Sequence, residues 1–252
     1  MDNTIIVSIF TSGAILLAHN HLISLRKAGY TNTISYCTNK LICDKLNEQG
    51  FTSEFIDEVD SEDYFKFNSS EFNEFSYIRF KIMLDLLEKY ENVWYLDVDT
   101  VILGDIWGAI NKEEEWDIQF QDDCMLPCTG NILARNTPNT KQLLEYLYNN
   151  KNNEWSGQMH LSTLIKESKI KIPINIKIMS IYNFCPGILY FPVSLLIPLE
   201  GEEKQARDII KKNFNEEVKK NKIRNPVLIH ANYIITREAK INALKTFKLW
   251  YI

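Results

Sequence analysis

The stretch NVWYLDVDTVILGDI, residues 92–106, decides the fold class of this chain. Its first half is apolar at consecutive positions, which is typical of a strand buried on both faces within a parallel sheet. The strand ends at Asp97 and Asp99, which are separated only by Val98. Residues i and i+2 of an extended chain point to the same side, so the two carboxylates should face one direction. They repel each other unless a cation neutralises them.

The sequence before this strand alternates between short β-rich runs and helical segments. In chain order these are TIIVSIFTSG (4–13), LLAHNHLISLRKAG (16–29), NTISYCTN (32–39), LICDKLNEQGF (41–51) and TSEFIDEV (52–59), the last a strand or an extended link. Such alternation indicates βαβ units and a parallel sheet. We therefore predict an α/β fold: a Rossmann-like, mostly parallel central sheet flanked by helices, in a single domain.

The segment 64–90 is expected to be helical in its second part, with Phe80, Met83, Leu84, Leu86 and Leu87 on one face. The remaining predicted strands are TVILGDI (100–106), DIQFQDD (117–123), TGNILARNT (129–137), IKIMSI (176–181), ILYFPV (188–193) and PVLIHANYI (226–234). The remaining predicted helices are 137–150, 201–222 and 238–247. Thr137 is expected to cap the first of these, with Pro138 in its first turn.

Composition excludes several classes of protein. The chain has 252 residues, is 24% charged and 45% hydrophobic, and carries a net charge of −5, a profile typical of a soluble globular domain. Its one basic run, 211–222, is interrupted by Glu216 and Glu217, so it indicates a solvated helix and not a nucleic-acid site. Cys124 and Cys128 lack the second pair of ligands that zinc needs.

The N-terminal segment carries no secretory signal pattern, because Asp2 stands where positive charge is expected. Its apolar part is too short and too polar to span a bilayer. Odd-numbered, irregularly spaced cysteines favour reduced thiols. We therefore expect a soluble cytoplasmic protein.

A second candidate ligand follows another apolar run near the C-terminus. His230 comes after Val227–Ile229 and is followed by Asn232 and, in the next helix, by Lys240. A lone histidine at a strand end is usually a structural residue. Two carboxylates with one imidazole instead suit Mn²⁺, because nitrogen donors favour transition metals, and a lysine can offset diphosphate charge.

Together, NVWYLDVDTVILGDI, LPCTGNILARNTPNTKQLLEYL and VLIHANYIITREAKINALKTFKLWYI resemble the GT-A type nucleotide-diphospho-sugar glycosyltransferases. The most similar group is that of the plant galactosyl- and xylosyltransferases, and glycogenin is more distant. The resemblance spans nearly the whole chain. It implies a GT-A fold with a nucleotide-binding half (1–105) and an acceptor-side half (106–252) that contains the C-terminal metal- and diphosphate-binding segment.

The resemblance also implies roles for individual residues. Asp97, Asp99 and His230 match the metal ligands, with Asp97 also beside the donor, and the cofactor would be Mn²⁺, with Mg²⁺ as the alternative. Lys240 matches the lysine that reaches the donor diphosphate. A basic residue on the helix before the acids should touch the donor, and two candidates match it: Lys81, sixteen residues before Asp97, and its neighbour Arg79.

Four further residues are implied to bind the donor. Phe10 and Thr11 match the turn that holds the nucleotide base, and Gly130 and Asn131 match the segment lining the donor sugar. Asn131 could equally be a turn former, and Lys81 a solvated helix residue.

The chain departs from the family pattern at two positions. The family usually has an Asp-Gln pair beside the reacting carbon of the sugar; here Gln158 is present but Gly157 replaces the acid. The glycine usual after the His-x-Asn-Tyr segment is Thr236. The first change puts acceptor recognition, or a protein nucleophile, in doubt, and leaves Gln158 as the catalytic-site candidate.

These residues predict a metal-dependent, retaining glycosyltransferase that moves a sugar from a UDP-sugar to an acceptor hydroxyl of a glycan or glycoprotein. The alternatives are a degenerate relative that binds nucleotide sugars without turnover, and a phosphatase of the haloacid dehalogenase type. The phosphatase motif needs threonine four places after its first Asp, where this chain has Val101. A sugar nucleotidyltransferase would need a Gly-rich basic loop that FTSGAILLAHN lacks.

Overall fold

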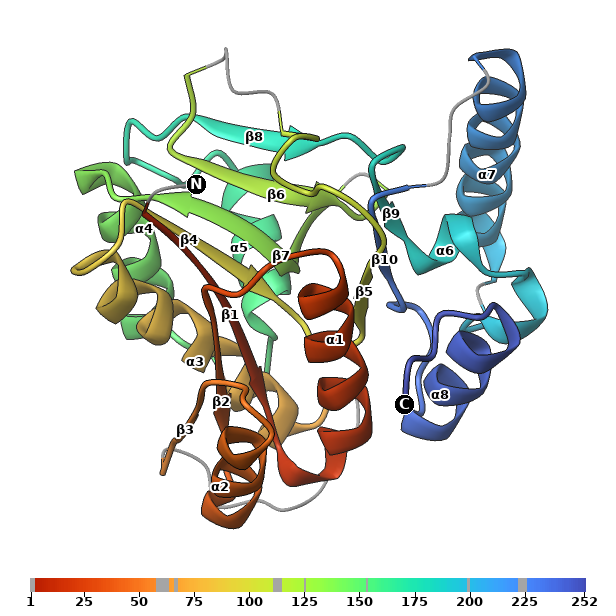
Figure 1. Cartoon of the computed structure of the whole chain (residues 1–252). Coiled ribbons are helices and arrows are strands. Elements are labelled where there is room, and N and C mark those ends of the chain that lie inside the picture. Colours follow the sequence, from red (N-terminus) through yellow and green to blue (C-terminus); the bar gives the residue numbers. More distant parts are fainter. Residues whose placement is uncertain are drawn as a thin grey trace.

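A computed structural model of the chain describes residues 3–57, 64–65, 68–110, 115–124, 126–152, 154–198, 200–221 and 226–252. A seven-stranded sheet in the order β3-β2-β1-β4-β7-β6-β8 forms its centre (Figure 1). The strands are β1 (Thr4–Phe10), β2 (Thr33–Cys37), β3 (Ser53–Phe55), β4 (Asn92–Leu96), β6 (Ile118–Asp122), β7 (Pro127–Arg135) and β8 (Ile176–Met179). β7 is antiparallel to both of its neighbours, and the other pairings of this sheet are parallel. The predicted mostly parallel α/β sheet is confirmed.

Helices cover both faces of this sheet. One face carries α1 (Ile15–Lys27) and α2 (Lys40–Glu48); the other carries α3 (Ser70–Leu87), α4 (Pro138–Asn149) and α5 (Gly157–Lys166). β4 shows why both faces are covered, because Val93 and Tyr95 pack on the α3 side while Trp94 and Leu96 pack on the α1 side. The run of consecutive apolar residues therefore forms a strand buried on both faces, as predicted.

A second, three-stranded sheet lies beside the C-terminal helices and has the order β5-β10-β9. Its strands are β5 (Thr100–Ile102), β9 (Phe184–Pro186) and β10 (Leu228–His230). The elements around it are η1 (Ser12–Ala14), α6 (Gly187–Tyr190), η2 (Val193–Leu195), α7 (Gly201–Asn221) and α8 (Arg237–Thr246). β10 pairs antiparallel with β5, which places His230 opposite Thr100. This pairing joins the C-terminal segment to the strand that follows Asp99.

The strand predicted at 188–193 is wrong. Strand β9 ends before this segment, at Pro186, and the chain then turns through α6. Lys211 of α7 donates its ammonium protons to the carbonyl oxygens of Ile188 and Phe191, at 3.0 and 2.5 Å, and so supplies the partners that a strand neighbour would have supplied. The run is apolar because it is buried on several sides, and such a run does not distinguish helix from strand.

Several other predicted elements agree with the structure, but the strands predicted at 100–106 and 226–234 are shorter: β5 ends at Ile102, and β10 begins at Leu228 and ends at His230. Thr137 caps α4 by accepting a hydrogen bond from the backbone N–H of Thr140, and Pro138 begins that helix. Gly29, after α1, has a φ of +89°, the left-handed conformation that ends a helix without steric cost in glycine. Of the predicted segment 52–59, β3 forms a strand of three residues. Positions 58 and 59, and position 222 of the predicted helix 201–222, lie outside the described residues.

Four chain segments meet at one edge of the main sheet. They are the carboxyl ends of β4, β6 and β10 and the amino end of β7, which is antiparallel to β4. Strands of the first predicted half (β3, β2, β1 and β4) and of the second half (β7, β6 and β8) join at β4 and β7 into one continuous sheet. The division into two halves therefore remains a prediction about function.

Candidate functional site

Asp97 and Asp99 follow β4 in a turn whose backbone is held by Thr100. The backbone N–H and the side-chain hydroxyl of Thr100 both donate to the carbonyl oxygen of Asp97, at 3.1 and 2.8 Å. Asp99 is buried, with 7% of its surface exposed, while Asp97 is half-buried. The turn therefore presents both carboxylates at the sheet edge where ligands bind in open α/β folds.

His230 completes a cluster with these two acids. Its Nε2 lies 3.1 Å from Asp99 Oδ1 and 3.9 Å from Asp97 Oδ2. One ligand atom from each of the three residues lies within 4.8 Å of the other two. The structure thus brings together the three residues that the sequence predicted as metal ligands, although His230 is far from the acids along the chain.

Lys240 joins the cluster from the first turns of α8. Its Nζ lies 2.6 Å from Asp99 Oδ2, so Asp99 is held between an ammonium group and an imidazole. The helix is positioned by Thr236, whose hydroxyl accepts a hydrogen bond from the backbone N–H of Ala239. Thr236, noted above as a departure from the family pattern, therefore caps the helix that carries Lys240.

The charges of the cluster compensate one another. Burial alone would raise the pKa of Asp99, but the Lys240 ammonium and the His230 imidazole hold it well below its usual value. Burial would lower the pKa of His230, and the Asp99 carboxylate instead raises it well above the usual value. A divalent cation entering the cluster would take over the charge-compensating role that His230 and Lys240 have in its absence.

Arg79, and not Lys81, contacts the acids. The Arg79 guanidinium is buried, with Nη1 3.3 Å from Asp97 Oδ1 and 2.5 Å from the carbonyl oxygen of Thr129. The hydroxyl of Tyr95 donates to the same Asp97 Oδ1 at 2.6 Å. Successive helical residues are rotated by about 100°, so Lys81, two positions on, points to a different side of α3. Of the two candidates, the geometry favours Arg79 as the basic residue next to the donor.

Gly130 leaves space for a cation between the acids and the histidine. A Cβ at this position would lie 2.5 Å from His230 Cε1 and still closer to Asp97 Oδ2. Two carboxylates and an imidazole form a donor set that suits a divalent cation. The residues of the cluster therefore fit a divalent cation, and the bare backbone of Gly130 is part of that fit.

Gln158 and a residue that the sequence analysis missed, Asp123, form the second part of the site. Gln158 Nε2 donates to Asp123 Oδ2 at 2.9 Å, and its Oε1 accepts from the backbone N–H of Thr129 at 3.1 Å. Asn232 Nδ2 donates to the other Asp123 oxygen at 2.8 Å. Burial raises the pKa of Asp123. Its position at the end of a predicted strand was the available signal.

Gly157 packs where a side chain would not fit. A Cβ on Gly157 would lie 2.7 Å from Phe80 Cε2, and its backbone N–H donates to Ser76 Oγ at 2.8 Å. The first turn of α5 therefore lies directly on α3. This close packing of the two helices leaves no room for an acidic side chain at position 157.

Gly157→Ala should lower the free energy of unfolding by about 1–3 kcal/mol, because the new methyl group overpacks against Phe80. Gly157→Asp should lower it further, since it also buries a carboxyl group, and it should not raise activity. Urea unfolding checks both, with the exposed Met159, two residues on, changed to Ala as the control. Full stability of Gly157→Asp would show that Phe80 moves aside and that the acid can be restored.

The remaining predicted donor residues are placed differently from one another. Thr11 lies directly after β1, whose neighbour β4 runs parallel to it and ends near the acids. The Phe10 side chain is fully buried in the cluster beneath α1 and α2, so only its backbone is near this edge. Asn131 is also fully buried, and its Oδ1 accepts from Trp94 Nε1 at 2.8 Å. Because strand residues alternate in direction, Asn131 points away from the face that Gly130 presents to the cluster.

His21 supports the acidic turn from behind. Its Nδ1 lies 3.0 Å from the carbonyl oxygen of Thr100, which can only accept, so this nitrogen carries the proton and Nε2 accepts from Ser8 Oγ at 2.9 Å. Burial lowers the pKa of His21 to about 4. Its contact with Thr100 links α1 to the turn that holds Asp97.

The lowered pKa of His21 predicts a loss of stability in acid. Between pH 6.5 and about 4 this histidine is protonated in the unfolded chain but not in the folded one, so unfolding takes up a proton and the free energy of unfolding falls as the pH falls. The full effect is about 3 kcal/mol. Urea unfolding from pH 7.5 to 4.5 measures it, and the difference from His21→Gln isolates it from other groups. Equal pH dependence in both proteins would contradict the prediction.

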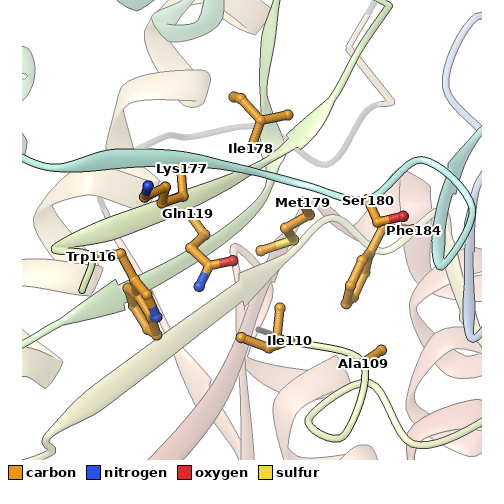
Figure 2. Close-up of a pocket in the computed structure, with 9 residues that line it drawn as sticks. All are labelled: Ala109, Ile110, Trp116, Gln119, Lys177, Ile178, Met179, Ser180 and Phe184. Atoms are coloured by element: carbon orange, nitrogen blue, oxygen red, sulfur yellow. The ribbon is translucent and has the colours of Figure 1, made fainter. Parts of the chain in front are cut away.

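A hollow of about 230 Å³ lies elsewhere, beside the edge strand β8 (Figure 2). Trp116, Gln119, Met179 and Phe184 are among its lining residues, and none of the cluster residues lines it. In Figure 2 the Gln119 amide points into this hollow. The candidate site at the sheet edge is therefore a separate surface.

Comparison with known proteins identifies the class. The architecture is that of GT-A glycosyltransferases. The sequence matches the profile of the nucleotide-diphospho-sugar transferase family over residues 32–244, so the chain belongs to that family. It is therefore a glycosyltransferase that uses a nucleotide-sugar donor. No sequence among curated proteins matches the chain.

Three solved structures with the same fold are distant from this chain in sequence. A glycosyltransferase involved in glycosylation of the major capsid of PBCV-1 has 11% identity and a TM-score of 0.57, over 97% of this chain and 99% of that one. GlyE of Streptococcus pneumoniae TIGR4 has 12% identity and a TM-score of 0.56, over 98% and 64%. The galactosyltransferase LgtC has 11% identity and a TM-score of 0.52, over 96% and 95%. None of the helices among the described residues has the length and apolar character needed to cross a bilayer.

Proposed function

We propose that this protein is a metal-dependent, retaining glycosyltransferase that moves a sugar from a UDP-sugar to an acceptor hydroxyl of a glycan or glycoprotein. The observation that carries the proposal is the buried cluster of Asp97, Asp99 and His230, with Lys240 at 2.6 Å from Asp99. Two acids, an imidazole and an ammonium group at one sheet edge suit a divalent cation shared with a diphosphate.

Asp97, Asp99 and His230 would hold the cation, and Mn²⁺ suits the nitrogen donor better than Mg²⁺. When bound, the cation supplies Lewis-acid stabilisation to the negative charge that develops on the leaving diphosphate. Lys240 adds a positive charge to the same group once it is released from Asp99. Arg79 holds one oxygen of Asp97, so that the other oxygen faces His230.

Asp123, Gln158 and Asn232 lie where the sugar and the acceptor would react. The bond from the anomeric carbon to the diphosphate oxygen breaks, the acceptor oxygen bonds to that carbon on the same face, and its proton passes to an oxygen of the departing diphosphate. No protein nucleophile is needed, which agrees with glycine at position 157. Asp123, held by the amides of Gln158 and Asn232, is in position to accept a hydrogen bond from a hydroxyl of the sugar or the acceptor.

A thermal-shift screen of nucleotide sugars with and without Mn²⁺ tests the proposal. We expect a UDP-sugar to raise the melting temperature only when Mn²⁺ is present. If no nucleotide sugar stabilises the protein in a metal-dependent way, the proposed function is wrong. Product analysis then separates the alternatives: release of UDP that depends on acceptor marks a transferase, and donor binding without turnover marks a degenerate relative.

The acceptor class can be approached in the same assays. The PBCV-1 neighbour takes part in glycosylation of a capsid protein, which supports including glycoproteins with free glycan ends among the acceptors. The stereochemistry of the product, read by NMR at the anomeric proton, tests retention directly. An inverted product would overturn the same-face step.

A further inference from the structure

Gln121 is a buried polar residue for which neither the fold nor the proposed reaction has so far required a role. It is the fourth residue of β6 and is fully buried. The register of β6 against β7 shifts between Phe120 and Gln121, so that Gln121 pairs with Cys128. Irregularities of this kind redirect side chains near functional sites. Here the side chain reaches both β9 and His230 of β10.

The orientation of the Gln121 amide follows from its two partners. One end lies 3.2 Å from the carbonyl oxygen of Phe184, and the other lies 3.1 Å from Nδ1 of His230. A backbone carbonyl can only accept a hydrogen bond, so the end beside Phe184 is the NH₂ group. The oxygen Oε1 must then face the imidazole.

This orientation decides which nitrogen of the ring carries a proton. Oε1 can only accept, so a hydrogen bond at 3.1 Å requires the proton to be on Nδ1 of His230. In a neutral imidazole the lone pair is then on Nε2, the nitrogen that faces Asp99 and Asp97. Metal-binding histidines are commonly oriented by such a partner on the other nitrogen.

We propose that Gln121 is a positioning residue of the cation site: anchored by the Phe184 carbonyl, it holds His230 in the tautomer and orientation that present the Nε2 lone pair to the cation. The inference rests on the proposed function, because it assumes that the cluster binds a divalent cation. It adds a residue that contacts neither the cation nor the substrate.

A neighbouring thiol shows what Gln121 prevents. Cys128 Sγ lies 3.7 Å from the same Nδ1, and a thiol is a weak hydrogen-bond donor. Without Gln121, the thiol could donate to an unprotonated Nδ1. The ring proton would then be on Nε2, and the nitrogen facing the acids could not bind a cation.

Gln121→Met tests the inference, because methionine has a similar volume but no acceptor at the ring. We expect the dissociation constant for Mn²⁺, measured by electron paramagnetic resonance or calorimetry on the whole protein without nucleotide, to rise about 10–100-fold. The Kd for Mg²⁺ should rise less, since Mg²⁺ depends less on a nitrogen ligand. The preference for Mn²⁺ over Mg²⁺ should therefore fall, an effect that general loosening of the site would not produce.

Matched variants separate positioning from packing. Gln119→Met makes the same change two residues earlier on β6, at a side chain that is also buried but points into the hollow of Figure 2, and should leave both Kd values unchanged. Gln121→Glu retains an acceptor at Nδ1 and should restore most of the Mn²⁺ affinity. If Gln121→Met does not fold, Gln121→Asn, too short to span both partners, should weaken Mn²⁺ binding in its place.

A double-mutant cycle with His230→Ala makes the test decisive. If Gln121 acts through the imidazole, Gln121→Met should weaken Mn²⁺ binding no further once His230 is absent. Two results would overturn the inference and leave the proposed function in place. One is equal weakening of Mn²⁺ binding in both backgrounds. The other is a folded Gln121→Met protein with unchanged Mn²⁺ affinity and selectivity. Absence of Mn²⁺ binding by the wild-type protein would overturn the metal site itself, and the role of Gln121 with it.

Discussion

Asp99→Asn should abolish the Mn²⁺-dependent stabilisation by donor and lower the rate of sugar transfer by about 10³-fold or more. Asp99 is the residue of the cluster that contacts both His230, at 3.1 Å, and Lys240, at 2.6 Å. An amide in its place is a poor ligand for a hard cation and leaves two buried cationic groups without their counter-charge. Thermal shifts with a UDP-sugar, with and without Mn²⁺, and initial transfer rates measure the two effects.

The same substitution should also lower stability. Removing one partner of a buried ion pair costs about 3–5 kcal/mol, and we expect the lower end of that range because His230 can lose its proton when Asp99 is absent. Urea unfolding in the absence of metal measures this cost. A variant with wild-type stability would mean that Lys240 leaves the buried cluster without penalty.

Lys240→Met is the matched comparison, and it should change the affinity for Mn²⁺ in the opposite direction. It frees Asp99 Oδ2 from its ammonium partner, so binding of Mn²⁺ alone should become equal or tighter, while donor affinity and transfer rate should fall. The reversed result, with Mn²⁺ binding lost in Lys240→Met and retained in Asp99→Asn, would exchange the roles assigned to the two side chains.

Gly130→Ala should have the second-largest effect, lowering the transfer rate by about 10²-fold, the order expected when a catalytic group is displaced by about 1 Å. The added methyl group would meet Asp97 Oδ2 and His230 Cε1, so it would enter the space between the ligands. We expect Mn²⁺ affinity and rate to fall together, because the methyl group separates the acid from the imidazole. Calorimetric titration of Mn²⁺ and initial rates test this.

Gly104→Ala provides the control for Gly130→Ala. The three atoms nearest to a methyl group at position 104 all belong to Val227, the closest being Cγ1 at 3.3 Å, and none belongs to the three ligands. Its Mn²⁺ affinity and transfer rate should match those of the wild type. If Gly130→Ala also matched the wild type, the cation would not lie between Asp97 and His230.

Much of this site was predictable because its residues follow apolar strands. Asp97 and Asp99 after β4, and His230 after β10, carry their signal locally: a buried run followed abruptly by groups that cannot remain buried alone. Asp123 had the same signal after β6 and was overlooked. A polar group at the carboxyl end of a parallel strand is a strong indication of a ligand-facing position.

Other features were beyond any local pattern. Arg79 and Lys81 are equally basic and two residues apart, and only the rotation of α3 against β4 turns Arg79 to Asp97. The family's missing acid at Gly157 is explained by Phe80, on another helix. The apolar run 188–193 is compatible with a strand. In the structure Lys211 of α7 supplies the partners for its carbonyl groups, and no strand forms.

By itself, the sequence determined the α/β sheet, the central position of β4 and the identity of the acids that follow it, because apolar periodicity and strand ends are properties of neighbouring residues. Only the tertiary structure decided that Gln121 faces His230, that Asp123 meets Gln158 and Asn232, and that Gly130 borders the cation site. These contacts depend on strand register and helix rotation. Both are set by the sum of many packing interactions between distant segments, which no single segment encodes.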